Sequence, residues 1–433
     1  MNDSEHPKAP VAARRPVEHT LHGRTRTDPY AWLKDESWQQ VMRDPARLNQ
    51  DIKAYLDAEN AYTQSVMADT ETLQSTLFGE MRGRIKEDDS SVPEDDGPFS
   101  YYVRYAKGGQ HPIYCRRPKR GRTGDEAAEQ VLLHGDEQAK GHDFFSVGTC
   151  DHSHDHCLLA YSVDLNGSEI YTIYVKELAS GELLADRIDN AQGDISWATD
   201  NEHLFYTVLD DNHRPSYVFR HRLGTPARDD ELVYEELDPG FFVGVSLTES
   251  RRFIVIDAHD HETSEVRLVD GGRPLSQPVV VAPREAGIEY SVSHSQRAGT
   301  DELLILTNAN GAEDFEIVHA ATGTPGREHW QALVAHQPGK LIVSMEVFKD
   351  YLIRLERENA LPRIVVRSLA SGHEHSIAFE EEAYSLGLDG GLEFDTTVLR
   401  FSYSSPTTPA RVYDYDMATR DRVLRKEQEV PSG

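Results

Sequence analysis

LLAYSVDLNGSEIYTIYVKELASGE, residues 158–182, contains the pattern that decides the fold. A strongly apolar run at 158–163 is followed by polar residues and then by a second run that has a polar face. Short runs rich in β-branched and aromatic residues, separated by turn residues, predict antiparallel strands. Gly181 then supplies the positive φ that a tight hairpin needs. The stretch therefore predicts two paired strands that end in a hairpin.

The same arrangement recurs along the chain from Pro98 onward. Each unit is predicted to open on an apolar strand, and a polar loop and a second strand follow. The seven opening strands start at Ser100, Leu158, Leu204, Phe253, Leu303, Tyr351 and Leu399. A repeat of about fifty residues is typical of propeller blades that have four strands each. The sequence predicts an all-β fold, a seven-bladed β-propeller.

The segment before the repeats has a helical pattern instead. In LNQDIKAYLDAENAYTQSVM, residues 48–67, apolar side chains recur mostly at three- and four-residue spacing. A second helix is expected from Thr70 to about Arg84. KEDDSSVPEDDGP, residues 86–98, then breaks the pattern and predicts a linker. The expected domains are a short α-helical N-terminal segment at 1–80 and the propeller at 81–433.

Composition limits the classes of partner and compartment. The net charge of −29 disfavours duplex DNA and anionic membranes, which need a basic surface. It could serve solubility alone or attract basic peptides. The three cysteines, Cys115, Cys150 and Cys157, fit a reducing compartment better than a disulfide framework. Residues 1–19 lack the apolar stretch of a secretory signal, so a cytoplasmic protein is expected.

Motifs that carry catalytic or metal chemistry are weak in this sequence. There is no G-x-S-x-G elbow, no P-loop and no H-E-x-x-H. The best metal-like cluster is CDHSHDHC, Cys150–Cys157, but a short His-rich tract is only compositional evidence, so a solvated turn is favoured over zinc or copper. Acidic pairs such as Asp95-Asp96 are expected in solvated loops. The prediction contains no catalytic, cofactor-binding or metal residues.

Several longer stretches resemble a known family. DPYAWLKD (28–35), MRGRIKEDDSSVP (81–93) and PIYCRR (112–117) resemble the prolyl oligopeptidase family of serine peptidases. GHDFFSVG (141–148) and DPGFFVGV (238–245) are similar to its oligopeptidase B branch. The resemblance follows the same order along nearly the whole chain.

The resemblance implies a seven-bladed propeller set as a lid over an α/β-hydrolase domain. That domain would combine an N-terminal segment, including Tyr30, Trp32 and Leu33, with a C-terminal third. KEQEVPSG (426–433) looks like the hinge into it. The family's serine, aspartate and histidine would lie beyond this sequence. The hydrolase domain is therefore expected to be absent, and no catalytic residue is carried over.

The function implied by the resemblance is that of the propeller portion of an oligopeptidase B-like serine peptidase that cleaves short peptides after Arg or Lys. The propeller would act as a size-filtering lid, and this chain alone would be non-catalytic. Expected partners are short basic peptides and a hydrolase domain in cis or in trans, with no nucleic acid, membrane or cofactor. A truncated gene, a split gene and an incomplete sequence stay open as origins of this chain. Two alternatives are a stand-alone propeller that binds peptides or proteins, and a metal-dependent or glycan-acting propeller.

Overall fold

A computed structural model describes residues 8–119, 129–297 and 299–431 of the chain. The first seven residues of the expected N-terminal segment and the last two of the expected propeller lie outside these ranges. The chain divides into two compact units. Unit 1 comprises Met1–Lys86, Asp211–His213 and Val430–Gly433, and unit 2 comprises Glu87–Asp210 and Arg214–Glu429.

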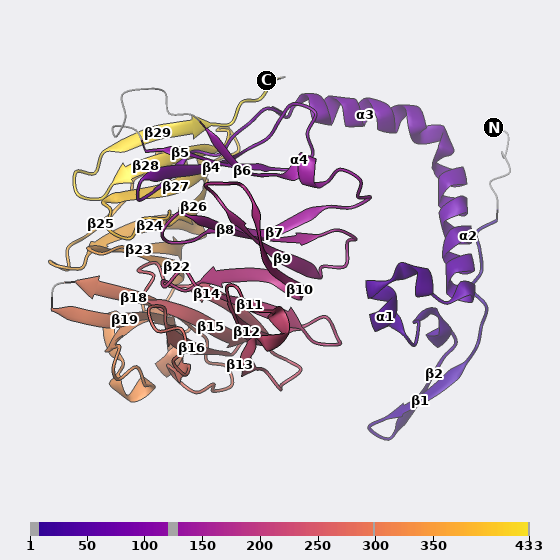
Figure 1. Ribbon diagram of the computed structural model, residues 1–433, viewed down its shortest axis with the longest axis horizontal. Helices are drawn as coiled ribbons and strands as arrows, with labels where there is room; N and C mark the ends of the chain where they lie inside the picture. The colour runs from indigo at the N-terminus through magenta and orange to yellow at the C-terminus, as the bar shows by residue number, and fades with distance from the viewer. Residues whose placement is uncertain (1–7, 120–128, 298, 432–433) are drawn as a thin grey trace. The chain divides into compact units, whose positions relative to one another are not determined.

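Unit 1 contains the helices and one hairpin (Figure 1). Its hairpin pairs β1 (Val17–Leu21) with β2 (Arg24–Asp28) and was not predicted. The α-helices are α1 (Trp38–Arg43), α2 (Gln50–Met67) and α3 (Glu71–Gly83), and short 3₁₀ turns occupy Ala31–Leu33, Pro45–Arg47 and Ala68–Thr70. Helix α2 begins where the side chain of Asn49 accepts a hydrogen bond from the Asp51 backbone N–H.

The apolar residues of DPYAWLKD are only partly buried by other residues of unit 1. Trp32 donates its indole N–H to the Ala13 carbonyl at 2.7 Å and lies edge-on to Tyr55. Arg15 covers the Trp32 ring, with its guanidinium carbon 4.4 Å from the ring centroid. Tyr30 is nevertheless 42% exposed, and the apolar side chains of α3 are exposed as well.

Unit 2 consists almost entirely of antiparallel sheets, which Figure 1 shows in sequence order from the purple β4 to the yellow β29. The short helical segments are α4 (Gly135–Gln138) and 3₁₀ turns at Ala227–Asp229, Ala309–Gly311 and Arg327–His329. The described residues of the unit form five sheets of four strands and one sheet of seven.

The four-stranded sheets take their strands in chain order. The first contains β3 (Glu94–Asp96), β4 (Phe99–Arg104), β5 (Ile113–Pro118) and β6 (Gln130–His134). The others are β14 (Phe242–Leu247), β15 (Phe253–His259), β16 (Ser264–Asp270) and β17 (Val279–Val280); β18 (Tyr290–Arg297), β19 (Thr300–Thr307), β20 (Glu316–Ala321) and β21 (Gln331–Val334); β22 (Lys340–Val347), β23 (Tyr351–Glu358), β24 (Leu361–Ser368) and β25 (Glu374–Ser376); and β26 (Ser385–Asp389), β27 (Val398–Ser404), β28 (Arg411–Asp416) and β29 (Arg422–Glu427).

The seven-stranded sheet corrects the expected blade count. It contains β7 (Ser146–His152), β8 (Leu158–Asp164), β9 (Tyr171–Glu177), β10 (Leu183–Trp197), β11 (His203–Leu209), β12 (Pro215–Arg222) and β13 (Glu231–Glu235). Strand β10 is 15 residues long; its first part pairs with β9 and its last part with β11. The propeller is therefore confirmed as an all-β fold, but seven separate four-stranded sheets are not present among the described residues.

The apolar strands that define the repeat are second strands, so the expectation that they open each unit is wrong. Strand β3, for example, precedes β4 and lies inside the stretch 86–98 that was expected to be a linker. Second strands are apolar on both faces because neighbouring sheets cover both faces. One such core joins Phe205 of β11 to Val243, Ile254 and Ile256 of the β14–β17 sheet. First strands of neighbouring sheets contact one another, as β18 and β22 do.

The first and the last sheets lie side by side (Figure 1), and no strand of the described residues belongs to both. Side chains link them instead. Arg400 of β27 donates to the Pro93 carbonyl at 3.0 Å, and Lys426 of β29 pairs with Asp89 at 2.7 Å. This junction is held by polar contacts that water can reach, unlike the apolar cores between the other sheets.

Candidate functional site

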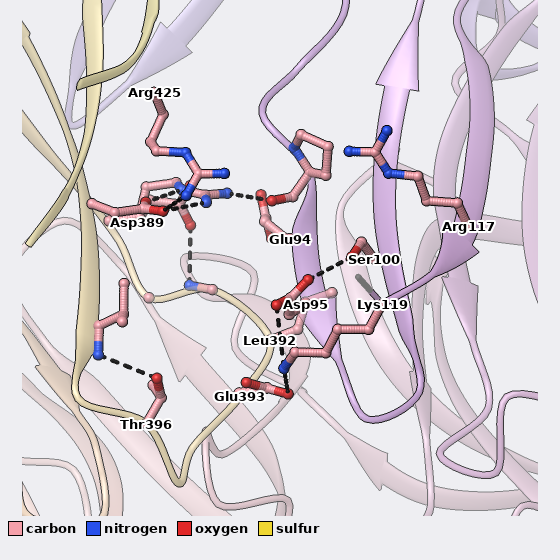
Figure 2. A pocket seen from close by; sticks show the side chains of 16 residues that line it. Glu94, Asp95, Ser100, Arg117, Lys119, Asp389, Leu392, Glu393, Thr396 and Arg425 are labelled. Atoms are coloured by element: carbon pink, nitrogen blue, oxygen red, sulfur yellow. Dashed lines mark hydrogen bonds and ion pairs between the residues drawn. The ribbon is translucent and has the colours of Figure 1, made fainter. Parts of the chain in front are cut away.

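A cavity of about 520 Å³ opens where the first and last sheets meet. Figure 2 shows its charged lining, which comes from β3 and its neighbours on one side and from β26–β29 on the other. The lining residues are Pro93, Glu94, Asp95, Ser100, Arg117, Lys119, Asp389, Gly390, Gly391, Leu392, Glu393, Thr396, Val398, Arg400, Asp414 and Arg425.

One wall of the cavity is the β26–β27 loop, residues 390–397. A larger residue would be disfavoured at each of its two glycines, for a different structural reason. A Cβ on Gly390 would lie 2.6 Å from Glu346 Oε2, so the Glu346 carboxyl would have to turn away to admit it. Gly391 has a φ of +65°, in the left-handed region that favours glycine. Its backbone N–H donates to Asp389 Oδ1 at 3.1 Å.

Lys119 joins this loop to the first sheet. Its Nζ lies 2.9 Å from Glu393 Oε1 and 3.2 Å from Asp95 Oδ2 (Figure 2). On the opposite wall Arg400 Nε donates to Asp414 Oδ1 at 2.8 Å, and Arg425 pairs with the other oxygen of the same carboxylate at 2.9 Å. Three of the cations that line the cavity, Lys119, Arg400 and Arg425, are thus engaged by carboxylates. The guanidinium carbon of Arg117 lies 5.4 Å from the centroid of the Tyr102 ring.

Several carboxyl groups of unit 2 have pKa values above their usual range. Burial, followed by repulsion from Asp389, raises the pKa of Glu94. Burial and then Glu249 and Asp389 raise the pKa of Glu346 to about 7. Burial likewise raises the pKa of Asp194 on β10. Glu94 and Glu346 lie on β3 and β22, the first strands of their sheets, and a nearby cation would stabilise the charged form of these carboxyls.

The predicted His-rich cluster does not come together as one group. Cys150–His152 belong to strand β7, and only the remainder forms the turn that was expected for all of it. His154 faces the Trp197 carbonyl, and Cys157 is exposed. His152 and His156 alone approach Asp96, and the three could offer ligand atoms within 4.8 Å of one another.

The partners of Asp96 argue against a cation at this position. Asp96 Oδ2 lies 2.8 Å from His152 Nε2 and accepts from Arg251 Nη2 at 2.7 Å. Although burial opposes it, these hydrogen bonds hold the pKa of Asp96 below its usual value. The Tyr101 ring stacks on His152 at 3.8 Å between centroids, and its hydroxyl is 2.9 Å from His156 Nδ1. A metal ion would have to displace a guanidinium.

The cluster is instead a polar link between sheets. Asp96 comes from β3, His152 from β7, and Arg251 from the turn between β14 and β15. Asp96 is only 4% exposed, so the expectation that the Asp95-Asp96 pair lies in a solvated loop is wrong for Asp96. Arg251, like His156 and Asn201 in the corresponding turns, has a positive φ. These equivalent left-handed positions were not predicted.

A serine, a histidine and an aspartate also meet in unit 2. Ser250 Oγ lies 2.7 Å from His294 Nδ1, and His294 Nε2 lies 2.8 Å from Asp301 Oδ1. Ser250 Oγ accepts from the Arg252 backbone N–H as well, which is the geometry of a turn. His294 is fully buried. The arrangement therefore stabilises the β14–β15 turn, and sequence reasoning missed it because Ser250 lies 44 residues before His294 in the chain.

Comparison with known proteins agrees with this architecture. Residues 10–428 match the family described as prolyl oligopeptidase, N-terminal beta-propeller domain. A dipeptidyl aminopeptidase BI from Pseudoxanthomonas mexicana is 38% identical over 98% of this chain and 58% of its own length. Protease 2 of Moraxella lacunata is 33% identical over 96% of this chain and 58% of its own length.

Solved structures give the same relationship. Oligopeptidase B from Leishmania major superposes with a TM-score of 0.89 at 30% identity, over 98% of this chain and 61% of that one. Oligopeptidase B from Trypanosoma brucei, solved with covalently bound antipain, gives 0.88 at 28% identity, over 98% of this chain and 61% of that one. The chain thus spans less than two thirds of the length of these relatives. It belongs to the prolyl oligopeptidase family, as the propeller domain of a peptidase related to oligopeptidase B.

Proposed function

We propose that this chain is the propeller portion of an oligopeptidase B-like serine peptidase that cleaves short peptides after Arg or Lys. The serine, aspartate and histidine would be supplied by polypeptide outside these 433 residues. The observation that carries the proposal is the alignment itself: 98% of this chain matches only 58% of the dipeptidyl aminopeptidase BI. A hydrolase domain in cis or in trans is then the main protein partner.

We further propose that the seven-stranded sheet acts as two blades that share β10, which gives seven blades in function. The division falls near Ala191, the residue at which pairing passes from β9 to β11. A ring of this kind would act as a lid that admits short unfolded peptides and excludes folded proteins. Within the described ranges no strand joins the first sheet to the last, which would let the ring flex at that junction.

The charge of the propeller supports a preference for basic peptides. The chain carries a net charge of −29, and Glu94 and Glu346 lie on the first strands of their sheets. Such a field raises the local concentration of cationic peptides and is weakened by salt. We expect kcat/KM for a dibasic peptide to fall as salt rises. The fall should be shallower in a variant whose exposed propeller acids are neutralised.

We place the protein in the cytoplasm, since all three cysteines are free thiols. No helix in the described ranges has the length and apolar character needed to cross a lipid bilayer.

The test is a fusion that joins this chain to the C-terminal portion of protease 2 from Moraxella lacunata. We expect the fusion to cleave short fluorogenic peptides after Arg or Lys and to leave folded proteins intact. Because one relative is named a dipeptidyl aminopeptidase, each peptide is assayed with a free and with a blocked N-terminus. Preference for free N-termini would indicate dipeptide release. Equal cleavage of basic and neutral peptides would refute the proposed specificity.

A further inference from the structure

Leu392, in the middle of the β26–β27 loop, lines three separate cavities. One is the 520 Å³ cavity described above. The second, of about 210 Å³, lies between β4–β6 and β7–β8, and the third, of about 500 Å³, lies beside the β14–β15 turn. Leu392 is the residue that the linings of all three cavities share, and Lys119 and Glu393 line both the first and the third.

The loop reaches this position by crossing the centre of the ring. Arg251 of the β14–β15 turn donates from Nη2 to the Leu392 carbonyl at 2.9 Å. The β14–β17 and β26–β29 sheets are separated on one side by the two sheets β18–β21 and β22–β25. On the other side the β3–β6 and β7–β13 sheets lie between them. Contact between these two sheets is therefore contact across the centre.

The loop is fixed firmly at one end and weakly at its tip. Phe394 packs against the apolar cluster that contains Met345, Val347 and Leu352, and its carbonyl accepts from the Lys349 backbone N–H at 3.0 Å. The tip is held by Arg251 and by the Lys119–Glu393 pair, whose side chains are 34% and 30% exposed. Partly exposed ion pairs of this kind contribute little to stability.

The sequence contains a hinge that would allow the tip of the β26–β27 loop to move. Gly390 and Gly391 directly precede Leu392, and consecutive glycines allow large changes in φ and ψ at low cost. We propose that the β26–β27 loop is a movable gate across the centre of the propeller. In this structure it is closed, and it opens when the tip, Leu392 and Glu393, leaves Arg251 and Lys119. The open gate would admit an extended peptide chain.

The chain contains its own reporters of the gate. Cys115 and Cys150 line the 210 Å³ cavity behind Leu392, whereas Cys157 is exposed. Burial raises the pKa of Cys115 to about 11 and also raises that of Cys150, so both thiols should react slowly. The alkylation rate of each cysteine is therefore compared with the rate of the same cysteine in other variants, and not with the rates of the other cysteines.

The experiment measures alkylation of each cysteine by mass spectrometry, with maleimides and iodoacetamides of increasing size. Three variants weaken the gate: Leu392→Ala, Arg251→Asn and Glu393→Gln. Asparagine suits the left-handed backbone at Arg251, as Asn201 does at the equivalent turn. Leu237→Ala, at a leucine that is 80% exposed, is the matched control.

We expect small reagents to alkylate Cys150 about tenfold faster in Arg251→Asn, the change that follows the loss of a hydrogen bond to a charged group. Leu392→Ala keeps that hydrogen bond but removes most of a side chain from the cavity wall, so it should also accelerate alkylation of Cys150. Glu393→Gln should give a smaller rise. Cys157 should react at one rate in all proteins, and large reagents should gain less than small ones. Unchanged rates at Cys115 and Cys150 in the folded variants would overturn the gate. So would acceleration that is independent of reagent size, because general unfolding would produce it.

Discussion

Replacement of Glu346 by glutamine should stabilise the propeller above neutral pH and leave it unchanged in mild acid. The Glu346 side chain projects from β22 beside the backbone of Gly390. Burial, Glu249 and Asp389 together raise its pKa from 4.5 to about 7. Glutamine keeps the shape and polarity of the side chain but cannot ionise. The variant therefore removes the ionisation alone.

The direction in which stability changes with pH follows from proton binding. A carboxyl with a raised pKa holds its proton more tightly in the folded chain than in the unfolded chain, so stability falls as pH rises from about 4.5 through about 7. A rise from 4.5 to about 7 corresponds to at most roughly 3 kcal/mol. Solvent screening at this half-buried position reduces the expected loss to about 1–2 kcal/mol.

The assay is urea unfolding between pH 5 and pH 8.5 for the wild type, Glu346→Gln and the exposed control Glu235→Gln. At pH 8 the Glu346→Gln protein should be more stable than the wild type by about 1–2 kcal/mol. The difference should shrink toward zero at pH 5, and the control should follow the wild type throughout. A stability difference that does not change with pH would refute the reasoning, since it would show that Glu346 does not titrate in this range.

Three further changes test other parts of the structure. His221 is fully buried, 2.7 Å from Asp230 and 3.1 Å from Asp186, and their hydrogen bonds raise its pKa although burial opposes this. In urea unfolding, His221→Gln should lower the free energy of unfolding by about 3 kcal/mol or more below pH 6, where His221 is charged and paired with both aspartates. The loss should become smaller as pH rises through the raised pKa of His221, and an equal loss at pH 9 would contradict this. Gly391→Ala should lower the free energy of unfolding by about 1–2 kcal/mol because Gly391 has a φ of +65°; a neutral result would mean that the backbone at this position does not need a left-handed conformation. Limited proteolysis should cut first between Lys86 and Pro93, ahead of β3, and leave unit 2 intact in gel and mass analysis; early cuts inside the sheets would argue against the division.

The sequence was sufficient to predict the second strand of each sheet, but it was insufficient to predict some of the others. Second strands such as β15 and β19 are covered on both faces and therefore show as continuous apolar runs. The first strand β3 is polar and only three residues long, and local patterning does not distinguish it from a loop. The blade count failed at β10 for another reason: one unbroken strand serves two pairings.

The candidate site was beyond sequence reasoning because it is assembled from distant parts of the chain. Lys119, Arg251 and Leu392 lie in three different sheets or their connections, and no local pattern relates them. The paired glycines at 390–391 were the one available signal, since they interrupt a strand repeat at a position where other units have short polar turns. The family resemblance supplied the architecture but no residue of this site.

Labelling with a fluorophosphonate probe tests the central claim most directly. The claim is that the propeller contributes to peptide hydrolysis without supplying the nucleophile. The probe is applied to this chain alone and to its fusion with the hydrolase portion of protease 2, and labelled peptides are identified by mass spectrometry. The account predicts one labelled serine, in the hydrolase portion, with cleavage of an arginyl peptide by the fusion only. Labelling of a serine within residues 1–433, such as Ser250, together with peptide cleavage by this chain alone, would contradict it.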